Sequence, residues 1–483
     1  MQPIKKPTLV QSLIPILVLV GLLAVNVLLV YGDDALSGAN QLALLISGGV
    51  AAIIALFNGY KWEDILKGIT QSIHSALPAV IILLLIGSLA GTWLLSGVVP
   101  AMIYYGLDIL NPTIFLFATC IISSIVSLAT GSSWSTVATV GIALLGIGKA
   151  LGIGDPIIAG AIISGAYFGD KMSPLSDTTN LAPAMAGTDL ITHIKYMAYT
   201  TIPSISITLI IFFIIGLFYD GGNQVNQVEE LQTAIASKFN ITPWLFLVPI
   251  AVIALIVKKV PAIPALLLGS LLGGVFAVIF QPDLITEIGG EVGFFTASYK
   301  AIIDSMTTDV AFVTSNDLVN ELLSSGGMSG MLNTIWLIVC AMVFGGVMDK
   351  TGMLKRLTQS IIGLAKTDGS LIATTATSCV VFNVTASDQY LAIVVPGKMF
   401  AEEYKERGLH PKVLSRTLED SGTVTSALIP WNTCGAYHSG VLGIATGDYF
   451  MYCFFNLISP LMTMLFGFLN IKISKIKGEN HKD

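Results

Sequence analysis

The sequence ISGAYFGDKMSPLSDTTN, residues 163–180, places two aspartates and a lysine inside a chain that is otherwise mostly apolar. A charged side chain at bilayer depth costs several kcal/mol unless it is paired or hydrated. Asp170, Lys171 and Asp177 therefore each need a structural or functional reason. Pro174 lies between them and removes a helical hydrogen bond, so the segment predicts a helix that is broken at its polar centre.

The composition indicates a membrane protein. The chain has 483 residues, of which 54% are hydrophobic and 11% charged, whereas a soluble domain is about a quarter charged. Apolar runs of membrane-spanning length recur at residues 9–31, 42–57, 202–218, 335–348 and 449–469. We expect the first run to be an uncleaved helix, because it is longer than a signal-peptide core and lacks a small-residue cleavage pattern. The fold class predicted is an all-α polytopic protein in a lipid bilayer.

Several functional classes are excluded by what the sequence lacks. It has no basic patch for nucleic acid, no Gly-rich phosphate loop and no Ser/His/Asp signature. We therefore predict neither an enzyme nor an ATPase, and no bound cofactor. The cysteines show no metal-ligand spacing and are expected to be buried packing residues: Cys120, Cys340, Cys379, Cys434 and Cys453.

The distribution of Lys and Arg predicts both termini on the cytoplasmic side. Lys5 and Lys6 precede the first apolar run, and a basic tail follows the last one. Two segments do not read as simple spans: residues 112–149 carry TGSSWS between two apolar arms, and residues 368–404 carry NVTASDQ. We interpret both as re-entrant hairpins, which a membrane tolerates where protein or a wet cavity satisfies the backbone. About ten full spans remain.

An internal repeat relates the two hairpins at an offset of about 255 residues. Each hairpin is followed by a short loop ending in X-Pro and by a broken helix, at residues 156–186 and 412–436. The predicted topology starts the first copy outside and the second inside, which makes an inverted repeat of the kind found in secondary transporters. Domain assignment follows: repeat cores at 112–200 and 368–447, scaffold helices at 1–111 and 201–367, and a last helix and tail at 448–483.

Two segments, residues 187–199 and 351–366, have an amphipathic pattern. Each is either a helix on the membrane surface or an extension of a neighbouring span, and the sequence does not separate these alternatives.

Four polar clusters converge in this scheme, two at the hairpin tips and two at the helix breaks. Pro174 and Pro183 in the first break and Pro430 in the second free carbonyl oxygens, and an oxygen-only site suits a hard cation such as Na⁺. The candidate residues for binding an ion or substrate are Thr130, Ser132, Ser133, Asp170, Lys171, Asp177, Thr178, Asn180, Asn383, Thr385, Ser387, Asp388, Glu419, Asp420, Asn432 and Thr433.

Each of these residues could instead have a purely structural role. The acids could be buried ion pairs or helix caps, with Lys171 and Arg416 as partners. The small hydroxyl residues could allow close helix packing. Lys171 could neutralise the neighbouring Asp170 or attract an organic anion. Aromatic residues next to the polar clusters could contact a substrate, although packing is the more frequent role: Trp134, Tyr167, Phe168, Trp431 and Tyr437.

The segments SGAYFGDKMSPLSDTTNLAPAMAGTDL, LEDSGTVTSALIPWNTCGAYHSGVLGI and TGSSWSTVATVGIALLGIG resemble the hallmark segments of the NhaC-type Na⁺/H⁺ antiporters. The resemblance implies a bacterial plasma-membrane exchanger with two re-entrant hairpins and two broken helices, similar to elevator-type carriers. It also implies sodium-site roles for Thr130, Ser132, Ser133, Asp170, Asp177, Thr178, Asn180, Thr385, Ser387, Asp388 and Asn432. Among these we expect the Na⁺ ligands to be Ser132, Ser133, Asp177, Asn180, Thr385 and Ser387.

The leading functional hypothesis is exchange of cytoplasmic Na⁺ for external protons, with a carboxylate pair, Asp170 and Asp177, alternating between the two ions. The second is Na⁺/H⁺-coupled exchange of small organic anions or amino acids of the malate/lactate type, in which Lys171, Asn432 and Thr433 contact a carboxylate. An ion channel is a third hypothesis, which so many buried acids disfavour. A homodimer is possible.

Overall fold

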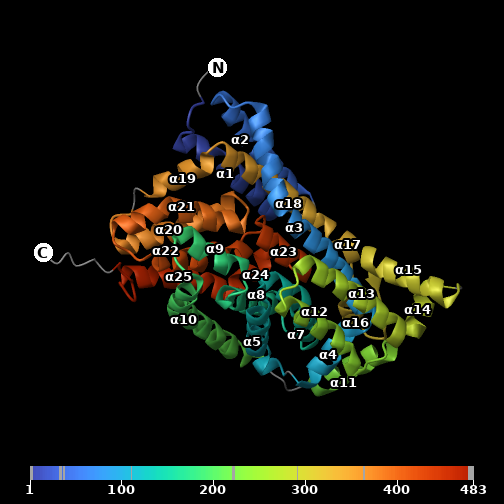
Figure 1. The fold of residues 1–483 in the computed structure, drawn as a ribbon. Helices are drawn as coiled ribbons and strands as arrows, with labels where there is room; N and C mark the ends of the chain where they lie inside the picture. Colours follow the sequence, from blue (N-terminus) through green and yellow to red (C-terminus); the bar gives the residue numbers. More distant parts are fainter. Residues whose placement is uncertain are drawn as a thin grey trace.

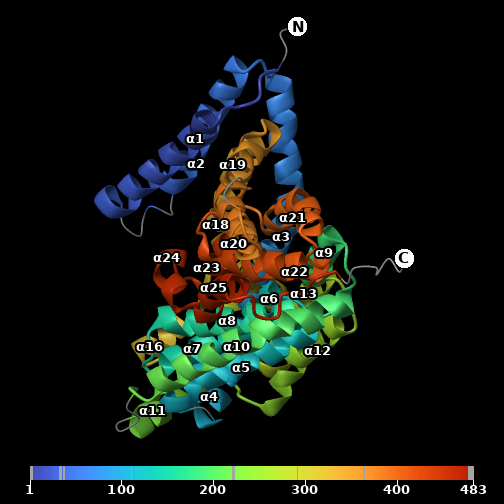
Figure 2. The same cartoon turned by 90° about the vertical axis from the view of Figure 1, so that its left-hand side faces the viewer.

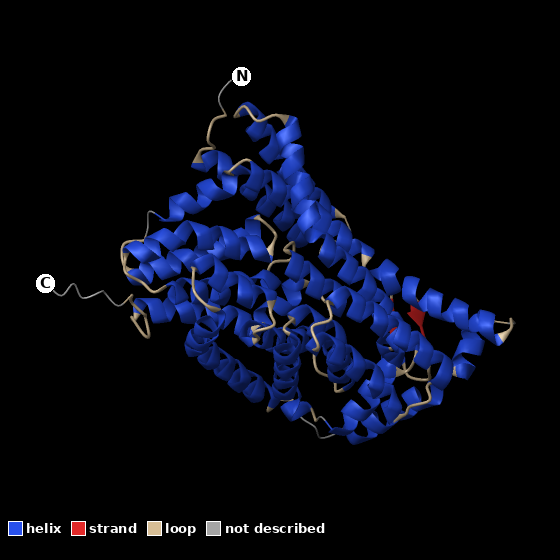
Figure 3. Ribbon diagram, viewed as in Figure 1, coloured by secondary structure: helices blue, strands red, loops and turns tan. Residues whose placement is uncertain are grey.

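The structure is a computed structural model, and it describes residues 4–31, 35, 38–109, 111–219, 224–290, 292–362 and 365–476. Helices make up nearly all of it (Figure 3). Two short strands in the described part, β1 (Val310–Ala311) and β2 (Ser324–Ser325), form an antiparallel pair in which Val310 lies opposite Ser325. The predicted all-helical fold class is thus confirmed, apart from this short strand pair.

The first half of the chain contains long helices and helices interrupted by turns or breaks. They are α1 (Leu9–Ala24, followed by a π-helical turn Val25–Val30), α2 (Ala39–Phe57), α3 (Trp62–Leu95), α4 (Val98–Ile109), α5 (Pro112–Thr130), α6 (Ser133–Thr136), a π-helical turn Val137–Gly141, α7 (Ile142–Ala150), α8 (Asp155–Met172), α9 (Asp177–Ala186), α10 (Leu190–Gly216) and α11 (Gln224–Lys238).

The second half of the chain contains long helices, broken helices and short turns. They are a 3-10 turn Pro243–Phe246, α12 (Leu247–Val257), α13 (Ala262–Phe280), α14 (Pro282–Gly289), α15 (Phe294–Thr307), α16 (Asp317–Leu322), α17 (Gly327–Gly330), α18 (Leu332–Lys350), α19 (Met353–Ile362), α20 (Asp368–Thr385), α21 (Gln389–Glu406), α22 (Pro411–Leu418), a π-helical turn Glu419–Thr423, a 3-10 turn Ser426–Leu428, α23 (Thr433–Leu442), α24 (Thr446–Tyr449), a 3-10 turn Phe450–Tyr452 and α25 (Phe454–Phe468).

Within the described residues, seven helices are long and apolar enough to cross a membrane, or up to nine if each of two bent pairs counts as one span. Large apolar side chains on these helices face outward, including Leu17, Ile210 and Ile279, each more than half exposed. Such surface is stable against lipid and costly in water, so the chain is a multi-pass membrane protein.

The predicted number of about ten spans stays a prediction, since seven to nine spans are the number found among the described residues by length and composition alone. The last apolar run, 449–469, is bent by 57° before α25.

Helices α1 and α2 lie at one end of the molecule, and α3 runs from there along one side, next to α18 and α13 (Figures 1 and 2). The polar segments α5–α9 and α20–α23 pack together, beside α10 and α25. The interrupted helices therefore form one bundle that packs against the long helix α3.

Backbone contact between α5 and α8 fixes one side of this bundle. A Cβ added at Gly165 would lie 2.2 Å from the carbonyl oxygen of Cys120, and one at Gly169 would lie 2.3 Å from that of Ser124. Ser127 Oγ donates a hydrogen bond of 2.5 Å to the carbonyl of Ala166. Small residues thus allow the two backbones to touch, as is common between membrane helices, and they hold the end of α8 in place.

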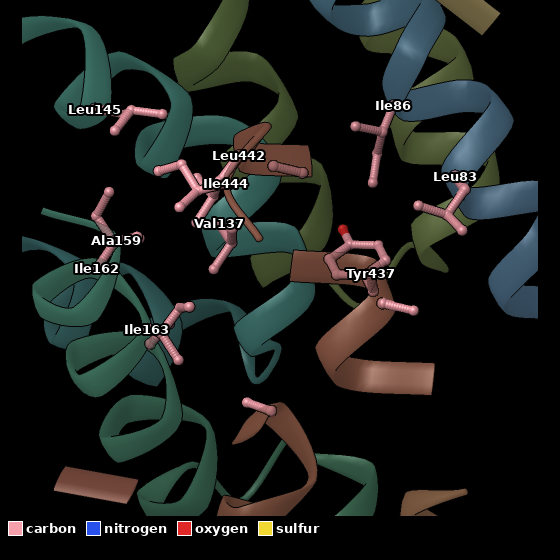
Figure 4. Packing of buried hydrophobic residues seen from close by; sticks show 14 of the residues in the cluster. Leu83, Ile86, Val137, Leu145, Ala159, Ile162, Ile163, Tyr437, Leu442 and Ile444 are labelled. Carbon is pink, nitrogen blue, oxygen red and sulfur yellow. The ribbon is translucent and has the colours of Figure 1, made fainter. Parts of the chain in front are cut away.

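An apolar core joins the bundle to α3. Figure 4 shows side chains of α3, the α6–α7 segment, α8 and α23 meeting at close range. The labelled residues are Leu83, Ile86, Val137, Leu145, Ala159, Ile162, Ile163, Tyr437, Leu442 and Ile444. All of them are buried, so the segments that carry the polar residues are supported by apolar packing on either side. The predicted burial of the five cysteines is also confirmed.

The two amphipathic segments have different outcomes. Residues 190–199 form the first turns of the continuous helix α10, so this segment is an extension of a span. Residues 353–362 form α19, a separate short helix that contacts α1, α18 and α20.

We predict that Gly169→Ala destabilises the protein by about 1–3 kcal/mol, because the added methyl group forces α5 and α8 apart. Gly49 in α2 is the matched control, since a Cβ there meets nothing within 4 Å. The thermal midpoint of detergent-purified protein should fall for Gly169→Ala and stay unchanged or rise for Gly49→Ala. Equal midpoints for the two variants would contradict the close packing.

Candidate functional site

The first broken helix is interrupted between α8 and α9, at residues 173–176. Ser176 caps α9 by accepting a hydrogen bond of 3.4 Å from the amide of Thr179. The Asn180 amide nitrogen donates to the carbonyls of Pro174 at 3.0 Å and Ser176 at 2.7 Å. The Asn180 amide thus satisfies two carbonyl groups of the break. Pro183 was expected in the break and instead lies inside α9.

The second broken helix passes from α22 through a π-helical turn to a break before α23. Asn432 caps α23 and donates through its amide nitrogen to the carbonyl and side-chain oxygens of Asn383, each at 3.1 Å. Asn383 in turn donates to the carbonyl of Gly422 at 2.7 Å and to Thr425 Oγ1 at 2.9 Å. The two asparagines therefore fasten the α20–α21 tip to the broken helix.

A buried ion pair connects the two broken helices. Lys171 Nζ, near the end of α8, contacts Asp420 Oδ1 in the π-helical turn, and both side chains are fully buried. Lys171 also donates to Ser459 Oγ at 2.9 Å, and Asp420 Oδ2 accepts from Thr200 Oγ1 at 2.8 Å. Lys171 was expected to neutralise Asp170 or to meet an anionic substrate. The structure instead confirms the structural alternative of a buried ion pair for Lys171, because its charge is matched by Asp420.

Arg416 was the other expected partner of the buried acids. Its guanidinium lies over the rings of Tyr196 and Phe466, at 4.7 and 5.9 Å from their centroids. It is fully buried and has no hydrogen-bond partner among the described residues. Of the two available partners for the buried acids, the described residues therefore show an acidic partner for Lys171 and none for Arg416.

A cavity of about 460 Å³ lies where the polar segments meet α3. It is lined by Ser75, Ala76, Pro78, Ala79 and Ile82 of α3, Ala262 of α13, and Gly131, Ser132, Ser133, Trp134, Ser135, Asp170, Ser176, Asp177, Thr178, Asp388, Gln389, Tyr390 and Thr433 of the bundle. Residues from both hairpins and both broken helices thus reach one space.

Four helices begin at this cavity: α6, which continues into α7, and α9, α21 and α23. The N-terminus of a helix carries a partial positive charge. Three carboxylates face three of these ends, because Asp177 lies in the first turn of α9, Asp388 caps α21, and Asp170 accepts from the first residue of α6. The helix ends stabilise the negative charge of these acids, and the acids together favour a cation in the cavity.

Hydrogen bonds orient the cavity carboxylates. Asp170 Oδ2 accepts from Ser133 Oγ at 2.7 Å and from the Ser133 amide at 3.2 Å. Asp388 Oδ1 accepts from the Leu391 amide at 2.9 Å. Asp170 is 7% and Asp388 5% exposed, whereas Asp177 is exposed. Asp170 and Asp388 are thus buried and held in fixed orientations by hydrogen bonds.

Seven of the sequence-predicted residues line the cavity: Ser132, Ser133, Asp170, Asp177, Thr178, Asp388 and Thr433. The other nine do not: Thr130, Lys171, Asn180, Asn383, Thr385, Ser387, Glu419, Asp420 and Asn432. Thr385 Oγ1 donates to the carbonyl of Val381 within its own helix. Ser387 adopts a positive φ of 59° and accepts from the Thr433 amide through its carbonyl. Most of this second set holds the backbone around the cavity.

Sequence reasoning missed the α3 wall and the residues Ser135, Ser176, Gln389 and Tyr390. Ser176 and Gln389 lie within the quoted polar segments, so the signal was present. Pro78 inside α3 was a second signal, because proline in an apolar span marks a place where other groups must satisfy the backbone. Among the aromatic residues, Trp134 stacks on Tyr437 with their ring centroids 4.0 Å apart, which supports packing as its main role.

We predict that Asp420→Asn destabilises the protein by about 3–5 kcal/mol, because it leaves the Lys171 ammonium buried without a counter-charge. The double variant Lys171→Met with Asp420→Asn should recover part of the loss. Thermal unfolding of the purified protein measures both. An Asp420→Asn variant as stable as the wild type would show that the ion pair is dispensable for the fold.

Known proteins are similar to this chain over most of its length. The model of the family described as the Na⁺/H⁺ antiporter family matches residues 165–471. The malate-2H⁺/Na⁺-lactate antiporter of Bacillus subtilis (strain 168) is 38% identical over 89% of this chain and 89% of that protein. The Na⁺/H⁺ antiporter NhaC of Alkalihalophilus pseudofirmus is 38% identical over 88% of this chain and 89% of that protein. The arginine/ornithine antiporter ArcD of Halobacterium salinarum is 35% identical over 98% of this chain and 94% of that protein. The chain belongs to the Na⁺/H⁺ antiporter family.

Proposed function

We propose that this protein is a secondary transporter that exchanges cytoplasmic Na⁺ for external protons. The observation that carries the proposal is the cavity in which Asp170, Asp177 and Asp388 meet at helix N-termini. Two relatives named as Na⁺/H⁺ antiporters, at 38% and 35% identity over most of the chain, support the same function. The channel hypothesis gains no support from these relatives.

The side chains around the cavity suit Na⁺. Hydroxyl and carboxylate oxygens from Ser132, Ser133, Asp170, Asp177 and Thr178 line one part of it, and such hard donors favour a hard cation over a soft metal. Of the six Na⁺ ligands expected from the sequence, Ser132, Ser133 and Asp177 lie there. Asp170 and Thr178 take the places of Asn180, Thr385 and Ser387 in this proposal, because those three are engaged elsewhere or lie outside the lining.

The way the cavity is built supports a proposal of alternating access. The bundle formed by residues 112–200 and 368–447 supplies its polar side, and α3 supplies a wall of small and apolar residues. Movement of the bundle as a unit against this wall, as in an elevator-type carrier, would expose the cavity to each side in turn. The inverted order of the two predicted repeats, with both termini cytoplasmic, provides two related conformations for such a movement.

We predict that, in proteoliposomes, a Na⁺ gradient drives counter-movement of protons with no organic solute present. Asp170→Asn should abolish this flux, because a neutral amide cannot compensate the charge of Na⁺, while the thermal midpoint stays near that of the wild type. Asp283→Asn, at an exposed carboxylate of α14, is the control and should transport normally. Undiminished flux in Asp170→Asn would remove Asp170 from the site.

A second candidate function is Na⁺- and H⁺-coupled exchange of a small organic anion or amino acid. The specific observation is the size of the cavity, which at about 460 Å³ falls in the range of sites for organic ligands. Thr433 lines it from α23, whose first turn contains no acidic residue, so this helix end is available to a ligand carboxylate. The relatives named for malate/lactate and for arginine/ornithine exchange belong to this class.

Solute-dependent thermal stabilisation separates the two candidates, since a ligand stabilises the state that binds it. With Na⁺ present, malate, lactate, arginine and ornithine should leave the thermal midpoint unchanged if Na⁺/H⁺ exchange is the whole function. A rise with one of these solutes, lost in Thr433→Val, would establish the second function.

A further inference from the structure

A second cavity, of about 350 Å³, lies where the segment before α1, the loop before α3 and the start of α19 meet. Its size falls in the range of sites for small ligands. Four of its lining side chains are basic: Lys5, Lys6, Lys355 and Arg356. They come from two segments that are far apart in the sequence, so the fold gathers four positive charges around one space. We call this space the basic cavity.

No acid neutralises the basic cavity within the described part of the chain. All four bases are exposed, and none forms an ion pair with a described residue. The acids at the same end of the neighbouring helices, Glu63, Asp64 and Asp349, are not among its lining residues. Helices α1 and α19 begin here without an acid in their first turns, and their partial positive charges add to those of the side chains. The cavity therefore attracts an anion.

Membrane topology alone does not require these bases to meet. Lys and Arg on the cytoplasmic side orient a membrane protein wherever they lie in the short loops. Here hydrogen bonds bring the segments together, because the Lys5 amide donates to the carbonyl of Asn58 at 2.9 Å and the Tyr60 hydroxyl donates to the carbonyl of Thr351 at 3.2 Å. Gly352, at a φ of 73°, turns the chain between α18 and α19. The basic cavity is thus a built feature of the fold.

The basic cavity adjoins apolar surface that faces lipid. Helix α1 begins directly after the lining residue Thr8, and Val10 in its first turn is 67% exposed. Phe57, at the end of α2 and next to Asn58, is 84% exposed. Such side chains are stable against acyl chains and costly in water. A free anion would contact the bases alone, whereas a phospholipid would contact the bases and the apolar surface together.

We propose that the basic cavity binds the headgroup of an anionic phospholipid, with the acyl chains along α1. The phosphate group lies between the bases of the two segments, and Thr8 and Gln359 offer neutral hydrogen-bonding groups to the rest of the headgroup. Basic pockets between helices at the cytoplasmic surface suit such headgroups, and the Lys and Arg distribution predicts this end of the chain to be cytoplasmic. The site does not depend on which solute the transporter exchanges.

A lipid in the basic cavity would hold α19 against α1. Helix α19 contacts α1 on one side and α20, the first arm of the second hairpin, on the other (Figure 1). The headgroup contacts bases from the segment before α1 and from the first turns of α19, so it bridges these two elements. The bound lipid therefore stabilises the attachment of the bundle to the scaffold helices, and thermal unfolding detects it.

The first test is a lipid titration of the full-length protein in detergent. Phosphatidylglycerol should raise the thermal midpoint, whereas phosphatidylcholine, which has no net charge, should not. The rise should shrink at high salt, because salt screens exposed charges. Lys355→Gln combined with Arg356→Gln should weaken the apparent affinity for phosphatidylglycerol about tenfold or more, since each base near the membrane surface contributes separately. A double variant with wild-type affinity would overturn the proposal.

Two controls separate this site from general charge effects and from free anions. Lys258→Gln combined with Lys259→Gln removes two exposed charges from the turn between α12 and α13, and it should keep the wild-type response. An equal loss of affinity in this control would overturn the site. Inorganic phosphate, at concentrations at which phosphatidylglycerol stabilises the protein, should leave the midpoint unchanged. Equal stabilisation by inorganic phosphate would overturn the assignment to a lipid.

Crosslinking tests the wild-type chain directly, so its result does not require a variant to fold. A phosphatidylglycerol with a photoreactive headgroup should label residues 4–8 and 352–359, and excess unlabelled phosphatidylglycerol should suppress the labelling. Mass spectrometry of the digested protein identifies the labelled peptides. Labelling confined to other segments would overturn the proposal.

Discussion

The contact between Lys171 and Asp420 is the interaction on which the site depends. It joins the end of α8 to the π-helical turn after α22, so each broken helix supplies one charge to the other. A buried pair of this kind contributes little net stability compared with apolar packing, but loss of either partner is severe. The pair is therefore important because it fixes how the two helix breaks face each other. Asp170 and Glu419 are adjacent in sequence to Lys171 and Asp420, so the pair also fixes their positions.

Polar residues at membrane depth have two separate roles in this protein. One set lines the cavity and presents oxygen atoms to it, as Ser133 and Asp170 do. The other set satisfies backbone groups that the breaks would leave unpaired, as Asn180 and Asn383 do. Both sets are required, because irregular backbone in a membrane is stable only where neighbouring groups complete its hydrogen bonds.

Much of the fold was predictable from sequence, and about half of the site. Apolar runs and X-Pro breaks locate α5, α8 and α9 because helix length and proline chemistry are local properties. The division of the polar residues into the two roles was not predictable. Asn180 and Asp177 lie in the same quoted segment, yet one amide turns back to bond Pro174 and Ser176 while the carboxylate meets the cavity. The choice of Asp420 over Asp170 as partner of Lys171 likewise depends on contacts between segments about 250 residues apart.

Pro78 makes α3, the scaffold helix that lines the cavity, easier to bend. It lies inside α3 among the residues that line the cavity, and it lacks the amide that would bond the carbonyl of His74. A helix bends most easily where such a bond is missing. Flexing of α3 at this point would widen or narrow the cavity without displacing a carboxylate.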